Sequence, residues 1–124
     1  MRVYFNDRYM APAHDADTTR KSGESAAAIE AGRLPGVELA DPAHLVDLAE
    51  QLISTVHAPE YVEALQTGHP SYLAESQGFT WDEGIWEMAA NSTAGVLAAV
   101  SAVMVVVGHL AMRPVLASSY DLKP

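Results

Sequence analysis

The feature of this sequence that most constrains its fold is a long Ala-rich run over residues 85 to about 104. The run is apolar on most helical faces, and its polar interruptions are Glu87, Asn91, Ser92 and Ser101. A helix that is apolar nearly all round is usually a buried one, so we expect the rest of the chain to pack around it. Glu87 and Asn91 stand one turn apart and predict a cap or a solvated edge. Residues 103–108 are β-branched, and periodicity leaves both a buried strand and the helix end open.

A membrane span is an alternative for residues 94–112, because they are long enough to cross a bilayer and His109 is their one ionisable residue. Against it, Ala, Gly and Ser contribute little to insertion, and the flanks offer Arg113 without a clear aromatic belt. The sequence therefore favours a core helix and predicts no membrane partner. Recovery of the chain in the soluble fraction would exclude the span.

The charge of the chain bears on the partners it can have. Sixteen acidic residues against seven basic ones give a formal net charge of -9. Phosphate binding needs clustered Lys and Arg, so we expect no nucleic acid partner, whereas a cationic amine substrate would be attracted. The absence of cysteine excludes disulfides and thiolate metal sites. The opening "MRVYFNDRYM" lacks the pattern of a signal peptide, and a cytoplasmic location is expected.

The first third of the chain predicts two short strands around one helix. Residues 2–5, "RVYF", are β-branched and aromatic and precede an Asn-Asp pair, which indicates a strand that ends in a turn. Residues 11–23 mix Pro, Asp, Thr and Gly without apolar periodicity and indicate an exposed loop. Residues 24–32 are rich in helix formers, and Gly32 is placed to end that helix. Residues 36–40, "GVELA", indicate a short second strand.

The next helix has a well-marked start. Asp41 is suited to accept from the free backbone donors as N-cap, and Pro42 fits the first helical position. An apolar stripe expected to face the core follows at Leu45, Leu48, Ala49 and Leu52.

A break and a restart follow this helix. Pro59 opens a new helix that Gly68 and Pro70 close, and residues 69–84 predict a loop with about one helical turn. We interpret His57 as a structural residue whose ring bonds to backbone at the junction, in preference to a base or a ligand.

Two separated motifs resemble a known family. "VHAPEYVEAL" over residues 56–65, followed some twenty residues later by "GIWEMAANSTAGVLAAVSAV" over 84–103, resembles the N-terminal third of the zinc-dependent histone deacetylase and acetylpolyamine amidohydrolase superfamily. The opening strand is similar too, so the resemblance covers roughly residues 1–103 and leaves 104–124 as a divergent tail. It implies an α/β fold, the front part of a three-layer α/β/α arginase–deacetylase domain with a few parallel strands and a long buried helix.

The resemblance carries no catalytic residue into this chain. In the family a His pair, an Asp-x-His and a later Asp follow the long helix, and this chain ends at Pro124 before reaching such motifs. Full-length relatives use zinc to hydrolyse acetyl-lysine or acetylpolyamine amides, and this chain alone is expected to bind no cofactor. The resemblance leaves open whether the chain is itself an enzyme. The tail does not read as the family's next strand, and an altered reading frame is one explanation.

The loop before the long helix supplies the substrate-binding candidates. Phe79, Trp81 and Trp86 bracket it, either as walls of a channel for an acyl chain or, as we favour, as anchors on the core. The family's rim acid aligns with Gly78, so Asp82, with its neighbour Glu83, takes that role only if the loop bends differently.

A second cluster of candidate ligands lies near the N-terminus. "HDAD", with His14, Asp15 and Asp17, has metal-ligand types, but a single loop lacks the converging ligand set that a metal needs. A solvated acidic loop is favoured, and a substrate-facing role in a completed enzyme is the alternative.

The leading hypothesis is therefore a truncated deacetylase-like protein that is non-catalytic alone. Exposed sheet edges and apolar faces then predict a homo-oligomer or a separate completing chain. The alternative is a non-catalytic binding or oligomerising module.

Overall fold

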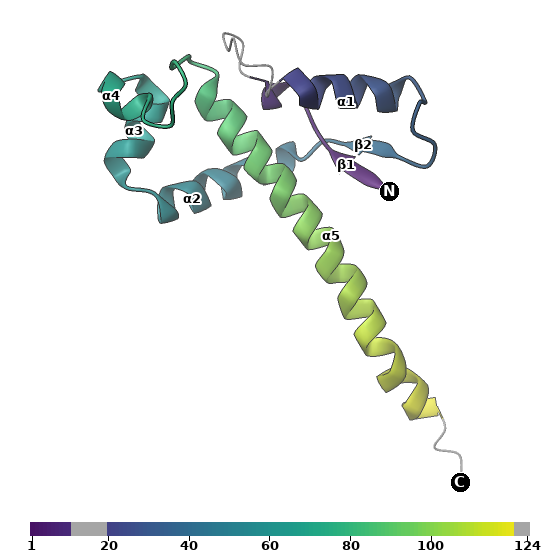
Figure 1. Cartoon of the computed structure of the whole chain (residues 1–124). Helices are drawn as coiled ribbons and strands as arrows, with labels where there is room; N and C mark the ends of the chain where they lie inside the picture. Colours follow the sequence, from purple (N-terminus) through teal and green to yellow (C-terminus); the bar gives the residue numbers. More distant parts are fainter. Residues whose placement is uncertain (11–19, 121–124) are drawn as a thin grey trace.

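The chain folds into a mainly helical structure with one small parallel sheet (Figure 1). This computed structural model describes residues 1–10 and 20–120, and it describes side chains up to residue 109. The strands are β1 (Arg2–Tyr4) and β2 (Glu38–Ala40). The α-helices are α1 (Arg20–Glu30), α2 (Val46–Val56), α3 (Pro59–Thr67), α4 (Ser71–Ala74) and α5 (Ile85–Tyr120), and two 3-10 turns are η1 (Asp7–Tyr9) and η2 (Ala43–Leu45).

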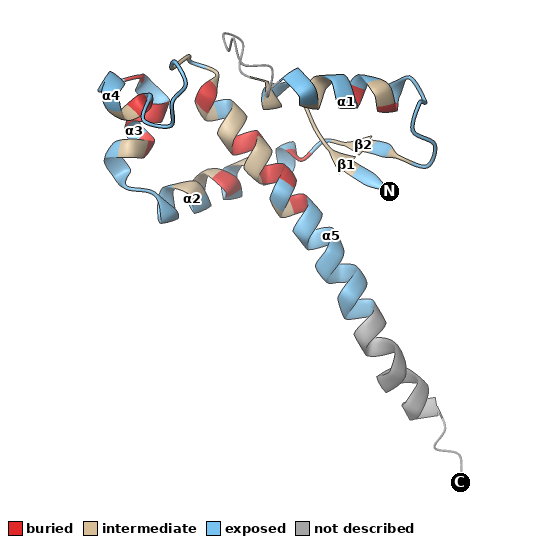
Figure 2. Cartoon of the chain, in the orientation of Figure 1, coloured by how far each residue is buried: buried red, intermediate tan, exposed pale blue. Residues whose placement is uncertain are grey.

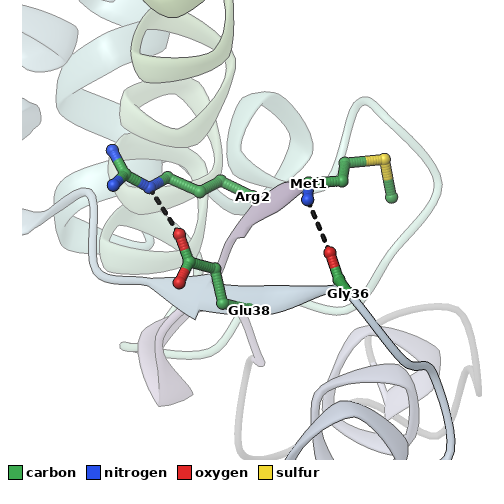
Figure 3. A network of polar contacts seen from close by, with 4 residues as sticks. All are labelled: Met1, Arg2, Gly36 and Glu38. Carbon is green, nitrogen blue, oxygen red and sulfur yellow. Dashed lines mark hydrogen bonds and ion pairs between the residues drawn. The ribbon is translucent and has the colours of Figure 1, made fainter.

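The two strands pair in parallel, with Val3 opposite Leu39 at the centre. Parallel strands need a crossover connection, and α1 lies within it, as in α/β proteins. Both predicted strands and the α/β character are confirmed at this level. Figure 3 shows the polar contacts at the N-terminal end of the sheet. Arg2 Nε lies 2.8 Å from Glu38 Oε1, and the Met1 ammonium donates to Gly36 O at 2.6 Å.

Glycine ends two of the helices, as predicted. Gly32 has φ +70° beyond α1, and the Arg33 N–H reaches back to Ala28 O at 3.0 Å, which closes the helix in a Schellman motif. Gly68 has φ +78° and donates to Ala64 O at 2.8 Å beyond α3, which begins with Pro59 at its first turn.

The start of α1 differs from its prediction. The helix begins at Arg20, so residues 20–23 are helical where a loop was expected. Gly23 costs little there, because its missing side chain makes room for Met10, whose Sδ would lie 2.6 Å from a Cβ at this position. Residues 11–19 of the expected loop lie outside the described residues.

The predicted start of α2 is confirmed only in the hydrogen bond to Asp41, because α2 itself begins at Val46. Asp41 Oδ1 accepts from the Ala43 N–H at 2.9 Å, but the first turn is the 3-10 helix η2 and α2 follows it. The predicted apolar stripe is half wrong. Ala49 is fully buried, whereas Leu48 and Leu52 are 45% and 39% exposed, since α2 packs on α5 from one side and these two side chains are left uncovered.

The junction at His57 is also different from the prediction. Its ring has no hydrogen bond to backbone within the described part of the chain, and it lies against Tyr61 with ring centroids 5.6 Å apart. His57 therefore contributes a ring contact with Tyr61 at the junction between α2 and α3. The expected single helical turn in the next loop is present as α4.

Helix α5 is largely covered over residues 85–98 and exposed over residues 99–109 (Figure 2). Ala90, Ala94 and Ala98 are at most 5% exposed, whereas every described side chain over 99–109 is exposed. Residues 103–108, left open between strand and helix, are helical, and α5 runs without a break across the boundary at 103/104. The expectation of a helix buried up to about residue 104 is wrong from residue 99 on, because α5 extends past the elements that cover residues 85–98 (Figure 1).

Candidate functional site

The carboxyl ends of both strands meet at a polar network that joins them to α5. Asn6 follows β1 and Asp41 follows β2. The Asn6 amide nitrogen donates to Asp41 Oδ1 at 3.0 Å and to Asn91 Oδ1 at 2.8 Å. Asn91, 1% exposed, in turn donates to Glu87 O at 2.8 Å within α5. We call Asn6, Asp41 and Asn91 the strand-end network.

Ligands of open α/β sheets bind outside the carboxyl ends of the strands, which makes this position a candidate binding site. The Asn6 donor and the Ala43 N–H hold the pKa of the Asp41 carboxyl below its usual range. The buried amide of Asn91 bonds at both its oxygen and its nitrogen. With these donors and acceptors paired internally, the network is built to fix α5 on the sheet.

Sequence reasoning missed the role of Asn91, which it placed at a cap or a solvated edge. The residue is buried because its partner Asn6 stands 85 positions earlier, a separation that helical periodicity does not sense. A usable signal was present: a single Asn in an Ala-rich run is costly to bury unless its amide is hydrogen-bonded.

A tight contact lies beside this network, between Tyr9 of η1 and Gly95 of α5. A Cβ at Gly95 would overlap the Tyr9 hydroxyl, so only glycine lets the ring lie this close to the helix. The hydroxyl is buried and has no hydrogen-bond partner among the described residues. Burial, and next the charge of Asp41, raise the pKa of Tyr9.

Trp81, a predicted substrate residue, makes several contacts with its own chain. Its indole Nε1 donates to Leu65 O at 2.8 Å. Its ring lies so close to Gly68 that a Cβ there would come within 2.8 Å of it. The ring also packs on the small core cluster of Leu65 and Ile85. These contacts favour the anchoring interpretation of Trp81.

The other two predicted substrate residues are placed differently. Asp82 accepts from the Gly84 N–H at 2.6 Å with Oδ1 and from the Ile85 N–H at 3.1 Å with its backbone oxygen, so it caps the start of α5. Phe79 is 44% exposed beside Gly78. Substrate binding by Phe79, Trp81 and Asp82 stays a prediction.

Metal ligands do not converge in the part of the chain that the structure covers, where no group of three His, Asp or Glu side chains is placed to hold an ion. His14, Asp15 and Asp17 lie outside the described residues. An open acidic groove does run beside α2, where Glu50 Oε1 accepts from Trp86 Nε1 at 2.9 Å and Asp47 lines the wall. Its openness suits solvated ions better than an enclosed substrate.

The longest run of exposed apolar side chains among the described residues lies on α5 from Val96 onward. Val96, Val100, Val103 and Val107 are 52–63% exposed. They follow one another at intervals of four, three and four residues, which places them on one side of the helix. We call these four residues the valine seam.

By length and composition, Ile85–His109 would suffice to cross a membrane, and 28% of its most apolar window is buried in the fold. A core helix of a soluble protein meets the same two conditions. The membrane alternative therefore has to be separated from protein association by experiment.

Comparison with protein families, with characterised proteins and with solved structures finds no match to this chain.

Proposed function

We propose that the chain is the N-terminal part of a deacetylase-like α/β domain, a scaffold without chemistry of its own that another chain completes. The observation that carries the proposal is the pairing of a small parallel sheet with a helix that is uncovered over residues 99–109. Parallel sheets occur almost only with both faces covered, and two strands are too few for an independently stable sheet. Further strands and helices are what such an arrangement lacks.

The order of elements supports the deacetylase-like part of the proposal. A first strand, a crossover helix, a second parallel strand, a helix restart at Pro59 and a long small-residue helix follow one another as the resemblance implies. The finer arginase–deacetylase arrangement, with its three layers, is proposed on this order together with the two sequence motifs.

The chemistry of the proposed scaffold follows from the residues it has. In a completed domain, residues outside this sequence would hold the zinc and supply the His pair that transfers protons, and Phe79 and Asp82 would border the substrate channel. The excess of acidic residues attracts an acetylated amine that retains a cationic group. We place this scaffold in the cytoplasm.

The direct test is amide hydrolysis by the purified chain. An acetyl-lysine peptide and an acetylpolyamine are incubated with the chain and added zinc, beside a no-protein control and a chelator-treated sample. The expected result is no turnover above the control. Chelator-sensitive turnover would contradict the non-catalytic assignment and would mean that a zinc site forms from residues of this chain.

The resemblance itself is tested by an experimental structure of the assembled form. A third strand added in parallel beside β1 or β2 supports the deacetylase-like domain. An assembly in which the sheet keeps two strands and helices alone cover α5 contradicts it. That outcome would favour the second candidate, a non-catalytic oligomerising module, for which the exposed valine seam is the specific observation.

A further inference from the structure

The two edges of the sheet differ in what lies beside them. Helix α5 lies against β1 and, within the part of the chain that the structure describes, it does not lie against β2. Strand β2 is contacted by α1 instead. A strand added beside β1 would therefore continue the sheet across α5, whereas a strand added beside β2 would extend the sheet away from this helix.

The backbone of β1 has free hydrogen-bonding groups on the edge that faces away from β2. Tyr4 stands opposite Ala40, and it is the next residue, Phe5, whose N–H donates to Ala40 O at 3.0 Å. In this parallel register alternate residues of β1 bond to β2, so the N–H and C=O groups of Arg2 and Tyr4 point to the other side. No residue that the structure describes forms a hydrogen bond with these backbone groups.

A hollow of about 310 Å³ lies between β1 and α5. Its strand wall includes Val3 and Tyr4, and its helix wall includes Gly95, Val96 and Ala99. The described lining includes no residue of β2, which places the hollow on the side of the free β1 edge. An occupant of the hollow would therefore meet backbone donors and acceptors on one wall and small apolar residues on the other.

An extended polypeptide backbone is the occupant that matches both walls. A strand presents N–H and C=O groups at the spacing of the free edge, and every second side chain points to the same face. A helix bonds its backbone internally and a lipid tail has no donor, so either of them would cover the Arg2 and Tyr4 groups without pairing them.

Charge defines the side chains of that strand. Residues 88–112 contain no Asp, Glu, Lys or Arg, so the side chains that face α5 are expected to be apolar. The whole chain has a formal net charge of -9, so basic residues at the flanks of the strand would be attracted and acidic ones repelled.

We propose that the free edge of β1 binds an extended segment of a partner chain, with apolar side chains facing α5 and basic residues at its flanks. The segment becomes the third strand of the sheet, pairs with the backbone of Arg2 and Tyr4, and fills the hollow over Gly95 and Ala99. The inference deepens the proposed function and rests on it for the presence of a completing chain. It adds which edge of the sheet that chain uses and the chemistry of the segment that binds there.

Two proline substitutions compare the two edges. Tyr4→Pro removes an N–H from the free edge of β1, and Leu39→Pro removes the corresponding N–H from the outer edge of β2. Neither N–H bonds across the sheet, and proline is tolerated on an edge for that reason. Tyr4→Ala removes the ring but keeps the N–H, so it separates the side chain from the backbone. Circular dichroism verifies that the variants keep their helices.

The probe is a synthetic peptide of alternating Val and Thr with Lys at both ends, and fluorescence anisotropy measures its binding to the full chain. We expect Tyr4→Pro to raise the dissociation constant at least about tenfold, and Leu39→Pro and Tyr4→Ala to change it less than about threefold. Absence of binding to the full chain overturns the proposal, and so does equal weakening by the two proline substitutions.

Amide exchange in the unsubstituted chain gives a second measurement, which decides if Tyr4→Pro loses its helices. Added peptide is expected to slow exchange of the Arg2 and Tyr4 N–H groups at least about tenfold and to leave the Leu39 N–H unchanged. Protection of Leu39 instead of Arg2 and Tyr4 overturns the proposal.

A matched peptide separates strand pairing from apolar contact alone. The same peptide N-methylated at every internal residue keeps its side chains but has no backbone donors there, and it is expected to bind at least about tenfold more weakly. Equal binding of the two peptides overturns the proposal.

The hydrolysis assay separates this inference from the proposed function. Zinc-dependent turnover by a chain that also binds the peptide at β1 supports the edge assignment and overturns the non-catalytic scaffold. A chain that neither binds the peptide nor hydrolyses the amides overturns the edge assignment and leaves the scaffold standing.

Discussion

Residues 85–98 and 99–109 of α5 differ both in their side chains and in their surroundings. Over residues 85–98 the helix packs on α2, η1, η2 and β1, and over 99–109 its side chains are exposed. The packed half places Ala90, Ala94 and Gly95 where neighbouring elements approach closely. The exposed half is rich in valine. In α5, small residues therefore lie where other elements of the chain pack against the helix, and larger branched residues lie where no element of the chain packs against it.

The largest expected effect comes from removing the amide that fixes the packed half. Asn91→Ala deletes the bonds to Asn6 and to Glu87 O and leaves a cavity, so we expect a loss of about 3 kcal/mol in the free energy of unfolding. Urea unfolding followed by circular dichroism, at one fixed protein concentration, measures it. Ser101→Ala, in the exposed half, is the control and should stay within about 0.5 kcal/mol. Equal effects of the two substitutions would remove the distinction between the halves.

A glycine in each half gives the next comparison. Gly95→Ala drives a Cβ into the Tyr9 hydroxyl, and we expect a destabilisation of about 2 kcal/mol from overpacking. In a Tyr9→Phe background the cost should fall, because the first atom in conflict is gone. Thermal and urea unfolding of the single and double variants measure the coupling. An additive result would show that Tyr9 does not lie against Gly95.

The unpartnered hydroxyl of Tyr9 predicts an intermediate effect of opposite sign. Tyr9→Phe removes a buried polar group without a bond and should stabilise the chain by about 1 kcal/mol.

Tyr9 also gives the chain a dependence on alkaline pH. Because burial raises the pKa of Tyr9 above its ordinary 10.0, the folded state holds the phenol proton more tightly. The associated stability is complete below pH 10.0 and is lost as pH rises through the folded-state value. Alkaline unfolding curves should shift to higher pH in Tyr9→Phe, and an unchanged curve would assign the transition to other groups.

The smallest effect belongs to the glycine of the exposed half. A Cβ at Gly108 meets nothing within 4 Å, so Gly108→Ala should gain helix propensity without any clash and stabilise by about 0.5–1 kcal/mol. It is also the matched control for Gly95→Ala. A destabilising result would mean that another element or another molecule lies against Gly108 in solution.

Local signals in the sequence predicted most of the elements, although not the start of α1 at Arg20 or the helical state of residues 103–108. Gly32, Asp41, Pro59 and Gly68 act where a cap or a stop was expected, because each acts through backbone geometry within a few residues. Both strands were also found from short β-branched or aromatic stretches. The parallel pairing itself followed from the family resemblance.

Burial was predicted less well, because it depends on partners far along the chain. Leu48 and Leu52 have the same periodicity as Ala49 and remain exposed. Helical periodicity indicates which side of a helix is apolar, but it does not indicate whether another element packs against that side. Asn91 shows the converse, a polar residue buried through a bond to Asn6 that no local pattern contains.

The parallel pairing of β1 with β2 also sets an order of events during synthesis. Val3 has its partner Leu39 36 residues later, so β1 leaves the ribosome without a neighbour and waits until α1 and β2 have been translated. The turn from α3 to α4, by contrast, closes over neighbouring residues at once. Loop closure over that distance is slower than closure of a local turn, so β1 is expected to become ordered later than the turn from α3 to α4.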